Sequence, residues 1–533
     1  MKVFNTFFLK YLVLTVLVFV FDLVFNPFNL FSFFNFIENV AFGATLVIPI
    51  FFFSSSFLKT IYFKLSYIFF AICLYAETVY YYLFKAYFSP SSIFVTLDTN
   101  TSESKEFLSF YVDTPIVILG VLLLSITVFF LFKRRLFLKT IKAKSKSYKL
   151  KIVALFLLAI VAIRQTRLIN FNLPYLILIS IVDYSIEAKK LGDYQKNKEG
   201  NFKDVFREAK NDEEVYVVLI GESTTRSHMG IYNYHRETTP RLDSIKKDLL
   251  IYENVISPHA YSVGALTKIL TLGNYENPKR TVEGSIVQLI NSAGFETYWV
   301  SNQRPIGAFE SLITKISLSS NNHKFLTTTV AGNSKVLDDA LLEPYKEILK
   351  NKSRKKVIFL HMMGTHHHYE NRYPRHYNKF KDAPKTKFKS QDSFEKINHY
   401  DNAILYNDFI ISEVIKSLDS LAVKSFVLYF SDHGEEMYSN INMAGHNEDI
   451  YSKQMFDIPF FLWQSKKYKA EENISFEKNR KYMTDDVFHS LANLLNISAR
   501  EVDTTRSIFN KNFKERTRVI KDTINYDTYF EGL

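Results

Sequence analysis

Two short strings in this chain combine the side chains of a metal site and stand about 210 residues apart. Gly221-Glu222-Ser223 follows the apolar run Val215–Ile220, and Ser-Asp-His-Gly-Glu at 431–435 follows the apolar run Ser425–Phe430. Runs of this length, rich in Val, Ile, Tyr and Phe, are typical of strands buried on both faces. Because chemistry in open α/β sheets collects at the carboxyl ends of the strands, the two strings are predicted to meet there.

Glu222, Asp432 and His433 offer two carboxylates and an imidazole, all good ligands for Zn²⁺. Gly434 permits the strand to break, so that the adjacent Asp432 and His433 both turn toward one metal. Three protein ligands leave a fourth position for a nucleophile or substrate. A lone Asp-His-Gly is more often only a turn, but a matched Glu at a second strand end favours the metal site.

Ser262 is the candidate nucleophile. It precedes an apolar pattern over residues 263–270 that predicts a helix, with Ser262 as its N-cap. A hydroxyl at a helix N-terminus lies where free N–H groups and the helix dipole favour an anionic phosphoryl group; the alternative is an ordinary cap. Thr267 and Thr271 are poorer candidates, because hydroxyls deeper in a helix tend to bond the carbonyl one turn back.

Histidines follow other predicted strand ends. His366 begins a run of three just past the apolar segment Lys356–Leu360, and His446 follows Gly445. Histidine runs on loops are often only solvated, and His446 alone carries little signal. His366 is the stronger candidate because it lies nearest the end of a buried strand.

The chain from residue 212 to residue 533 has the pattern of a soluble α/β domain. Predicted strands alternate with helical patterns at Ser285–Ala293 and Asn402–Ser420, which indicates a mainly parallel sheet. The lysine-rich segment Asn378–Ser390 is predicted to be a mobile loop. Its lysines, over Lys379–Lys389, are either simply solvated or attractive to an anionic glycolipid surface.

The first 170 residues have the pattern of a membrane domain. Four apolar stretches are long enough, or nearly so, to cross a hydrocarbon core about 30 Å thick, and a shorter fifth ends before Arg164. The five predicted spans are Phe7–Phe25, Phe36–Phe53, Ile61–Phe84, Pro115–Phe132 and Leu150–Ile163. The apolar stretch Phe171–Tyr184 and the polar residues up to 211 are predicted to form an interfacial and bridging segment.

Basic residues set the expected topology. Lys133–Lys151 carries nine Lys and Arg and no acid, so it should be cytoplasmic. Five spans then place the large domain outside the cytoplasmic membrane; with four spans it would be cytosolic. We expect membrane lipid, and no nucleic acid, among the partners of this chain of net charge +12. A single cysteine, Cys73, excludes a disulfide within the chain.

These residues resemble the membrane-bound phosphoethanolamine transferases of Gram-negative bacteria, within the alkaline phosphatase/sulfatase superfamily. The resemblance covers five spans, a bridging segment and the catalytic domain. It is carried by the motifs Gly221–Pro240, Glu253–Ser262, Met363–His366, Phe430–Glu435 and Gly445-His446, and by Trp299–Gln303 and Asn371–Pro374.

The resemblance implies an inner-membrane enzyme with its catalytic domain in the periplasm. It implies one zinc ion, or two, with Glu222, Ser262, Asp432 and His433 around the metal. Phosphatidylethanolamine would give its phosphoethanolamine to Ser262, and the group would pass to lipid A or a core sugar of lipopolysaccharide. The residues placed near the substrate are His366, His446, Asn302 and Gln303.

Two departures from the family pattern bear on this expectation. The family nucleophile is usually Thr, and here Ser262 stands in its place. The paired cysteines of the lipid A-modifying branch are absent, which points to the cysteine-poor branch that resembles core-oligosaccharide transferases. The alternatives are a phosphoglycerol transferase, a phosphate or sulfate ester hydrolase of the same superfamily, and a non-catalytic metal-binding envelope scaffold.

Overall fold

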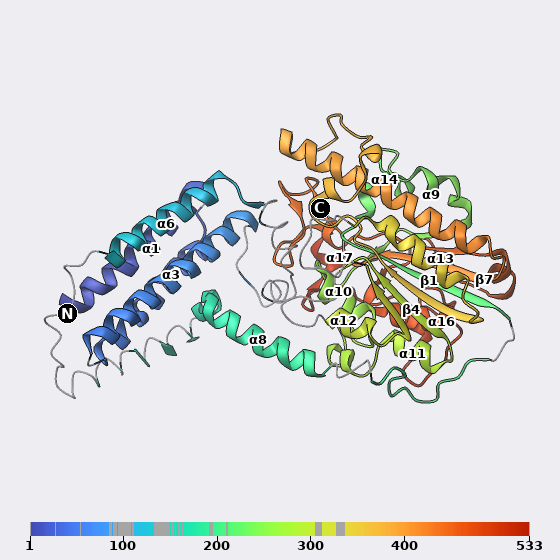
Figure 1. Ribbon diagram of the computed structural model, residues 1–533, viewed down its shortest axis with the longest axis horizontal. Helices are drawn as coiled ribbons and strands as arrows, with labels where there is room; N and C mark the ends of the chain where they lie inside the picture. The colour runs from blue at the N-terminus through green and yellow to red at the C-terminus, as the bar shows by residue number, and fades with distance from the viewer. Residues whose placement is uncertain are drawn as a thin grey trace. The chain divides into compact units, whose positions relative to one another are not determined.

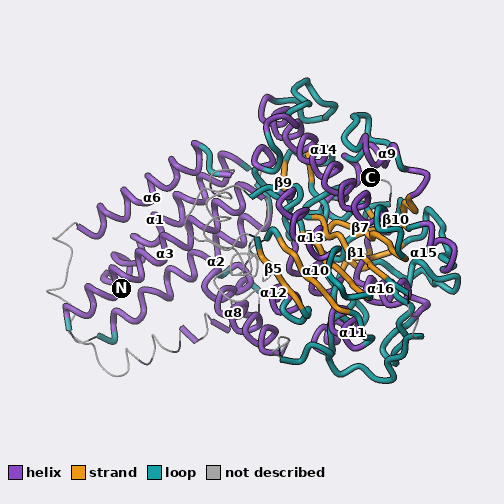
Figure 2. The backbone as a smooth tube through the Cα atoms, turned by 45° about the vertical axis from the view of Figure 1, so that its right-hand side comes forward, coloured by secondary structure: helices purple, strands orange, loops and turns teal. Residues whose placement is uncertain are grey.

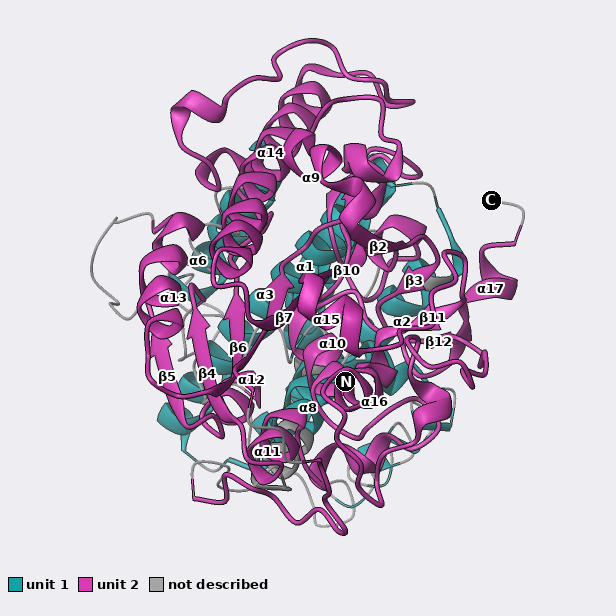
Figure 3. Cartoon of the chain, turned by 90° about the vertical axis from the view of Figure 1, so that its right-hand side faces the viewer, with its two compact units in different colours: residues 1–94, 111–184 teal, residues 95–110, 185–533 magenta. Residues whose placement is uncertain are grey.

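The structure is a computed structural model that divides the chain into two compact units. It describes residues 2–26, 28–53, 55–84, 111–132, 167–190, 196–208, 212–303, 312–326 and 336–531, with isolated residues between 85 and 166. One unit comprises residues 1–94 and 111–184, and the other comprises residues 95–110 and 185–533 (Figure 3).

Among the described residues of the first unit, four helices are long and apolar enough to cross a membrane. They are α1 (Lys2–Phe25), α2 (Leu30–Val47), α3 (Ser56–Phe84) and α6 (Thr114–Phe132). Aromatic rings fill the space between them: Tyr11 of α1 packs edge-on against Tyr67 and Phe70 of α3. Each of the first four predicted spans falls on one of these helices, whereas the fifth, Leu150–Ile163, lies mostly outside the described residues.

Most of the predicted interfacial stretch lies in α8 (Leu173–Lys190), which continues six residues beyond Tyr184. Its start is hydrogen-bonded to α2 and α3. The Asn172 amide donates to Glu38 Oε1 at 2.9 Å, and the Leu173 N–H donates to Glu77 Oε1 at 3.3 Å. The backbone at the beginning of α8 is therefore tied to the helices of the first unit by two buried carboxylates.

The second unit is built on a seven-stranded sheet (Figure 2), and the expected mainly parallel arrangement is confirmed. The spatial order is β2-β10-β7-β1-β6-β4-β5, and only β10 runs antiparallel to its neighbours. The strands are β1 (Glu214–Gly221), β2 (Leu249–Tyr252), β4 (Glu296–Ser301), β5 (Asn322–Phe325), β6 (Lys355–His361), β7 (Lys424–Ser431) and β10 (Phe460–Gln464).

Helices cover both faces of this sheet (Figure 1). One face packs against α10 (Ser262–Ile269), α11 (Ile286–Ser292), α12 (Leu312–Ser317) and α16 (Val487–Leu494). The other packs against α13 (Leu342–Leu349) and α14 (Gln391–Asp419). The smaller elements are α9 (Pro240–Ser244), β3 (Val255–Ile256), β8 (Glu436–Met437), β9 (Ala444–Gly445), α15 (Lys466–Glu471), β11 (Tyr482–Met483), β12 (Val519–Ile520), β13 (Ile524–Asn525) and α17 (Tyr526–Tyr529).

The predicted helices are present with shifted bounds. The pattern Ser285–Ala293 is α11, which Ser285 caps. The pattern Asn402–Ser420 is the second half of α14, which begins eleven residues earlier, at Gln391. It begins there because the Ser390 hydroxyl accepts from the Ser393 N–H and the Ser393 hydroxyl accepts from the Ser390 N–H, which caps the first turn.

Strands β1 and β7 position the candidate metal ligands. Both are buried along all eight residues, as the apolar runs predicted. They pair in parallel with Gly221 opposite Ser431. The next residues, Glu222 and Asp432, therefore leave neighbouring strands at the same edge of the sheet.

Candidate active site

Glu222, Asp432 and His433 form one compact, fully buried group. His433 Nε2 lies 3.4 Å from Glu222 Oε1 and 3.5 Å from Asp432 Oδ2. Four ligands at about 2.0–2.2 Å from a tetrahedral zinc lie roughly 3.3–3.6 Å from one another. The spacing of these side chains is therefore one that could hold a zinc ion.

Hydrogen bonds orient Asp432 and His433 so that one atom of each remains for a bound ion. Asp432 Oδ1 accepts from the Ser223 and His433 N–H groups, whereas Asp432 Oδ2 is buried without a donor. His433 Nδ1 lies 2.8 Å from the Gly434 carbonyl, so Nδ1 donates there and Nε2 is the nitrogen that a metal ion would bind in place of a proton. A buried orphan carboxylate oxygen beside this nitrogen fits a bound cation.

The Ser262 hydroxyl faces this group. Its Oγ lies 3.1 Å from both carboxylate oxygens of Glu222 and 3.4 Å from His433 Nε2. The prediction that Ser262 is an N-cap is wrong: Tyr261 is the N-cap, and Ser262 is the first residue of α10. The reason is that Tyr261 keeps an extended backbone while its carbonyl accepts the first helical bond, from the Ala265 N–H. Ser262 is thus in the helix terminus, where its hydroxyl and free N–H groups meet.

The turn that carries Glu222 is held in an unusual backbone conformation. Ser223 has a φ of 55°, which non-glycine residues rarely adopt. Hydroxyls of Thr365 and Tyr400 both donate to the Ser223 carbonyl at 2.8 Å. Gly364, with a φ of +54°, passes so close that an added Cβ would lie 2.6 Å from the Glu222 carbonyl oxygen. These contacts fix the Glu222 side chain in place.

The electrostatics of this group favour a positive charge. Burial opposes ionisation of Glu222, but hydrogen bonding and charge from His433 outweigh it and hold the pKa of Glu222 well below its usual value. Burial, followed by the Glu222 charge, raises the pKa of Asp432. Burial opposes protonation of His433, yet the two carboxylates raise its pKa to about 10. Two carboxylates therefore face a single imidazole, and the negative charge of the group favours binding of a cation.

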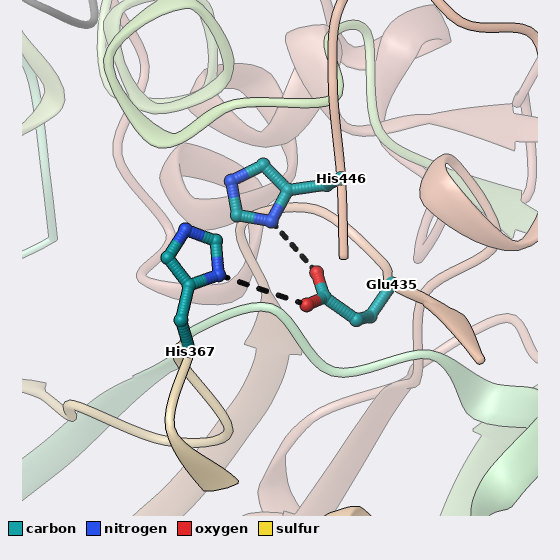
Figure 4. Close-up of side chains that lie close together, drawn as sticks. All are labelled: His367, Glu435 and His446. Atoms are coloured by element: carbon teal, nitrogen blue, oxygen red, sulfur yellow. Dashed lines mark hydrogen bonds and ion pairs between the residues drawn. The ribbon is translucent and has the colours of Figure 1, made fainter. Parts of the chain in front are cut away.

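His367, Glu435 and His446 form a second group with metal-ligand composition (Figure 4). His446 Nδ1 lies 2.7 Å from Glu435 Oε2, and His367 Nδ1 lies 4.0 Å from Glu435 Oε1. The Tyr369 hydroxyl donates to Glu435 Oε1 at 2.5 Å. The two groups adjoin, because the rings of His433 and His446 have centroids 4.1 Å apart.

Of the other predicted site residues, Gln303 contacts the first group and Asn302 does not. Gln303 Nε2 donates to Glu222 Oε2 at 2.8 Å. The Asn302 amide instead donates to Asp338, whose carboxylate accepts the Met363 and Gly364 N–H groups. Asn302 thus supports the turn that packs on Glu222.

His366 and His446 both lie beside these groups. The His366 ring centroid is 4.5 Å from that of His367, and the Glu222 charge acts on its pKa, which burial lowers well below the usual value. Sequence reasoning missed His367 and Glu435. Glu435 stands in the Ser431–Glu435 string, and its place two residues after a candidate ligand was an available signal.

Comparison with known proteins identifies the family of this chain. The sulfatase family model matches residues 214–497. The phosphoethanolamine transferase EptC of Escherichia coli K12 is 30% identical over 530 residues, covering 92% of this chain and 90% of the relative. The phosphoethanolamine transferase CptA of Salmonella typhimurium is 30% identical over 491 residues, covering 85% and 84% of the two chains.

Two solved structures are similar as well. The zinc complex of the C-terminal periplasmic domain of Escherichia coli EptC matches with a TM-score of 0.59 and 33% identity, over 61% of this chain and 96% of that domain. The integral membrane lipooligosaccharide phosphoethanolamine transferase A of Neisseria meningitidis shares the fold of nearly the whole chain. Its TM-score is 0.70 at 21% identity, over 96% of this chain and 98% of that one. The chain therefore belongs to the sulfatase family, and within it to the phosphoethanolamine transferases, as its motifs predicted.

Proposed function

We propose that this protein transfers phosphoethanolamine from phosphatidylethanolamine to lipopolysaccharide, at lipid A or a core sugar, through a phosphoethanolamine-Ser262 intermediate. The observation that carries the proposal is the position of the Ser262 hydroxyl, 3.1 Å from Glu222 and 3.4 Å from His433. Relatives over nine-tenths of the chain are named phosphoethanolamine transferases, which supports the same reaction here.

The metal is proposed to be zinc, held by Glu222, Asp432 and His433 with Ser262 as the fourth group. A relative's domain of 33% identity was solved with zinc, and the ligand types and spacings here suit that ion. Zinc at this position would act as a Lewis acid on oxygen and favour the ionised form of the serine hydroxyl. His367, Glu435 and His446 are the candidate ligands for a second ion.

In the first half-reaction, Ser262 Oγ bonds to the donor phosphorus and the bond from phosphorus to the glycerol oxygen breaks. Diacylglycerol leaves with that oxygen and takes up a proton. The Ser262 hydroxyl donates toward Glu222, which holds Oγ in line for attack. The N–H groups of the first turn of α10 face the charge that spreads over the phosphoryl oxygens.

In the second half-reaction, an acceptor hydroxyl or phosphate oxygen attacks the same phosphorus and the Oγ–P bond breaks. Ser262 recovers its proton, and the cycle closes. His366 and His446 are proposed to hold the phosphoryl oxygens. Glu435 orients the His446 ring through Nδ1 at 2.7 Å, which leaves Nε2 for the substrate side.

The site is proposed to lie in the periplasm, on a multi-pass protein of the inner membrane. Four of the described helices are suited to membrane spans, and the proposed fifth span, Leu150–Ile163, makes the number of crossings odd. The related domain of Escherichia coli EptC is described as periplasmic. A membrane domain keeps the site beside its lipid donor. We propose residues 1–170 as the membrane domain, 171–211 as the bridging segment and 212–533 as the catalytic domain.

Mass analysis tests the reaction directly. Purified full-length protein, incubated with phosphatidylethanolamine, is expected to carry one phosphoethanolamine group on the peptide that contains Ser262 and to release diacylglycerol. Adding lipopolysaccharide should discharge the adduct. A phosphoglycerol adduct from phosphatidylglycerol, or simple hydrolysis of a phosphate or sulfate ester, would assign the alternative activities instead.

A further inference from the structure

The segment Lys379–Lys389 presents lysines on an ordered backbone. Its lysines are all exposed, whereas Phe380 and Pro384 between them are buried and Thr386 and Phe388 are half-buried. The five lysines are Lys379, Lys381, Lys385, Lys387 and Lys389. We call this segment the basic strap. The alternation means that the backbone lies on the domain while the charges point into solvent.

Several hydrogen bonds fix the strap. The N–H groups of Lys379 and Phe380 both donate to Asn402 Oδ1 of α14 at 2.9 Å. The Thr386 hydroxyl donates to the Tyr438 carbonyl at 2.6 Å, and the Ser393 hydroxyl donates to the Phe388 carbonyl at 2.6 Å. A backbone fixed in this way has already lost the entropy that binding would cost a mobile loop.

The strap is hydrogen-bonded to two segments that carry site residues. Arg236, in the loop that follows Glu222, donates to Asp382 of the strap at 2.9 Å. Tyr438, which accepts from Thr386, lies between Glu435 and His446 in the β8–β9 hairpin. The basic strap therefore borders the loops that hold the first and second groups.

The positive charge of the strap is available to a partner. Its single acid, Asp382, is paired with the buried Arg236. Among the described residues, Lys381, Lys385, Lys387 and Lys389 make no ion pair. Lysine ammonium groups act on phosphate as point charges, and a row of them suits a ligand with several phosphates.

The two substrates of the proposed reaction differ in charge. Phosphatidylethanolamine is zwitterionic, so the donor gains little from a cationic surface. Lipopolysaccharide carries several phosphates on its sugar backbone. We infer that the basic strap binds the phosphate groups of the acceptor glycolipid while its acceptor group enters the site. This inference rests on the proposed function and names the feature of the acceptor that is recognised.

Binding of a water-soluble acceptor fragment tests the inference. The probe is the phosphorylated sugar backbone of lipopolysaccharide, freed of acyl chains by alkali, titrated calorimetrically into full-length protein in detergent. The variant is Lys385→Gln/Lys387→Gln/Lys389→Gln. We expect its Kd to rise roughly ten- to hundred-fold, since each lysine near an anionic surface contributes about five-fold. Added salt should weaken wild-type binding more steeply than variant binding.

Two controls isolate the strap from bulk charge and from phosphate-independent binding. Lys279→Gln/Lys350→Gln/Lys511→Gln removes the same charge from three exposed positions elsewhere on the same unit, and its Kd should equal that of wild type. The same fragment after enzymatic dephosphorylation should bind wild type and the strap variant equally. The melting temperature and zinc content of both variants report whether the fold is kept.

Three results would overturn the inference. They are an unchanged Kd in the strap variant, an equal loss in the scattered control, and a loss that persists with the dephosphorylated fragment. A strap variant that binds the fragment normally but adheres less to phosphatidylglycerol vesicles would assign the strap to the membrane surface instead. Failure of the proposed function is seen separately, as the absence of any phosphoethanolamine adduct on wild-type Ser262.

Discussion

The two acid-and-histidine groups at this site are neighbours with opposite electrostatic character. In the first, two buried carboxylates raise the pKa of His433 to about 10, and Asp432 Oδ2 has no hydrogen-bond donor. In the second, burial lowers the pKa of His367 to about 3, and the Glu435 carboxylate already accepts from Tyr369 and His446.

The difference indicates that the first group is incomplete without a cation, whereas in the second both carboxylate oxygens of Glu435 are already hydrogen-bonded. The two groups also differ in the backbone elements that carry them. The first group stands at the ends of two central strands, and the second on a loop and a short hairpin. We therefore expect tight metal binding at the first group, and weaker, adjustable binding of metal or phosphate at the second.

The largest expected effect is at Ser262, which only the first group contacts. Ser262→Ala should lower transfer by at least about 10⁴-fold, because removal of a covalent nucleophile leaves only binding and electrostatics. Zinc content and melting temperature should stay near wild type. Ser262→Thr should be tolerated, since it adds one methyl.

Thr271→Ala is the matched control, because its hydroxyl is bonded to the Thr267 carbonyl. An adduct on Thr267 or Thr271 would show that the nucleophile is misplaced.

Asp432→Ala should follow, with transfer falling by about 10³-fold and zinc content falling in parallel, since a ligand of the cation-requiring group is lost. The measurements are metal analysis and lipid turnover on the same preparation. Asp408→Ala is the control: this equally buried carboxylate caps α9, through the Arg241 and Leu242 N–H groups, and touches neither group. Full zinc occupancy in Asp432→Ala would show that Asp432 is not needed to bind the cation, and the first group could not then be distinguished from the second by its need for metal.

His446→Ala should have an intermediate effect, lowering transfer roughly 10- to 100-fold while zinc in the first group is kept. Glu435→Gln should reproduce part of this loss, because the ring of His446 loses its charged anchor. If either variant emptied the first group of zinc as completely as Asp432→Ala does, the two groups would have to be treated as one cooperative site.

The smallest expected effect is on the melting temperature at acid pH. It is expected at a residue outside both groups, so it distinguishes unfolding from loss of metal. Burial, followed by the charge of Arg506, lowers the pKa of His489, a residue of α16 that belongs to neither group, to about 3. A depressed histidine pKa means that the unfolded chain binds the proton first. Its stabilising contribution is complete above about pH 6.5 and is lost as the pH falls toward 3. His489→Asn, whose Oδ1 can still accept from the Asp503 N–H, should flatten the fall of melting temperature over this range without changing transfer at pH 7.5. An unchanged slope would exclude His489 as a cause.

The sequence predicted those parts of the site that follow directly from buried strands. Glu222, Asp432 and His433 each come two or three residues after an unbroken apolar run, so strand ends alone brought them together. Glu435 and His367 could not be placed in this way, because their positions depend on a hairpin and a loop whose backbone is set by tertiary contacts. Asn302 shows the opposite error: it follows a strand, yet its amide is engaged by Asp338, a partner 36 residues away.

The same limit applies to helix termini. The apolar spacing located α10 and α11, but whether Ser262 or Tyr261 is the N-cap depends on which carbonyl accepts the first helical bond. The start of α14 was missed because its first turns are polar, and polar turns give no apolar periodicity. Span lengths in the first unit were predictable because a bilayer fixes them from outside the chain.

The strand order has a consequence for how the protein is made. Strand β1 pairs with β6 and β7, which are synthesised about 140 and 210 residues after it. At about 5–20 residues per second, β6 follows β1 after roughly seven to thirty seconds and β7 after roughly ten to forty. Until β6 is made, β1 is an eight-residue strand with two open edges, and no metal group can assemble before β7 is complete. A nascent chain stalled before residue 424 should therefore depend on chaperones, bind no zinc and be degraded.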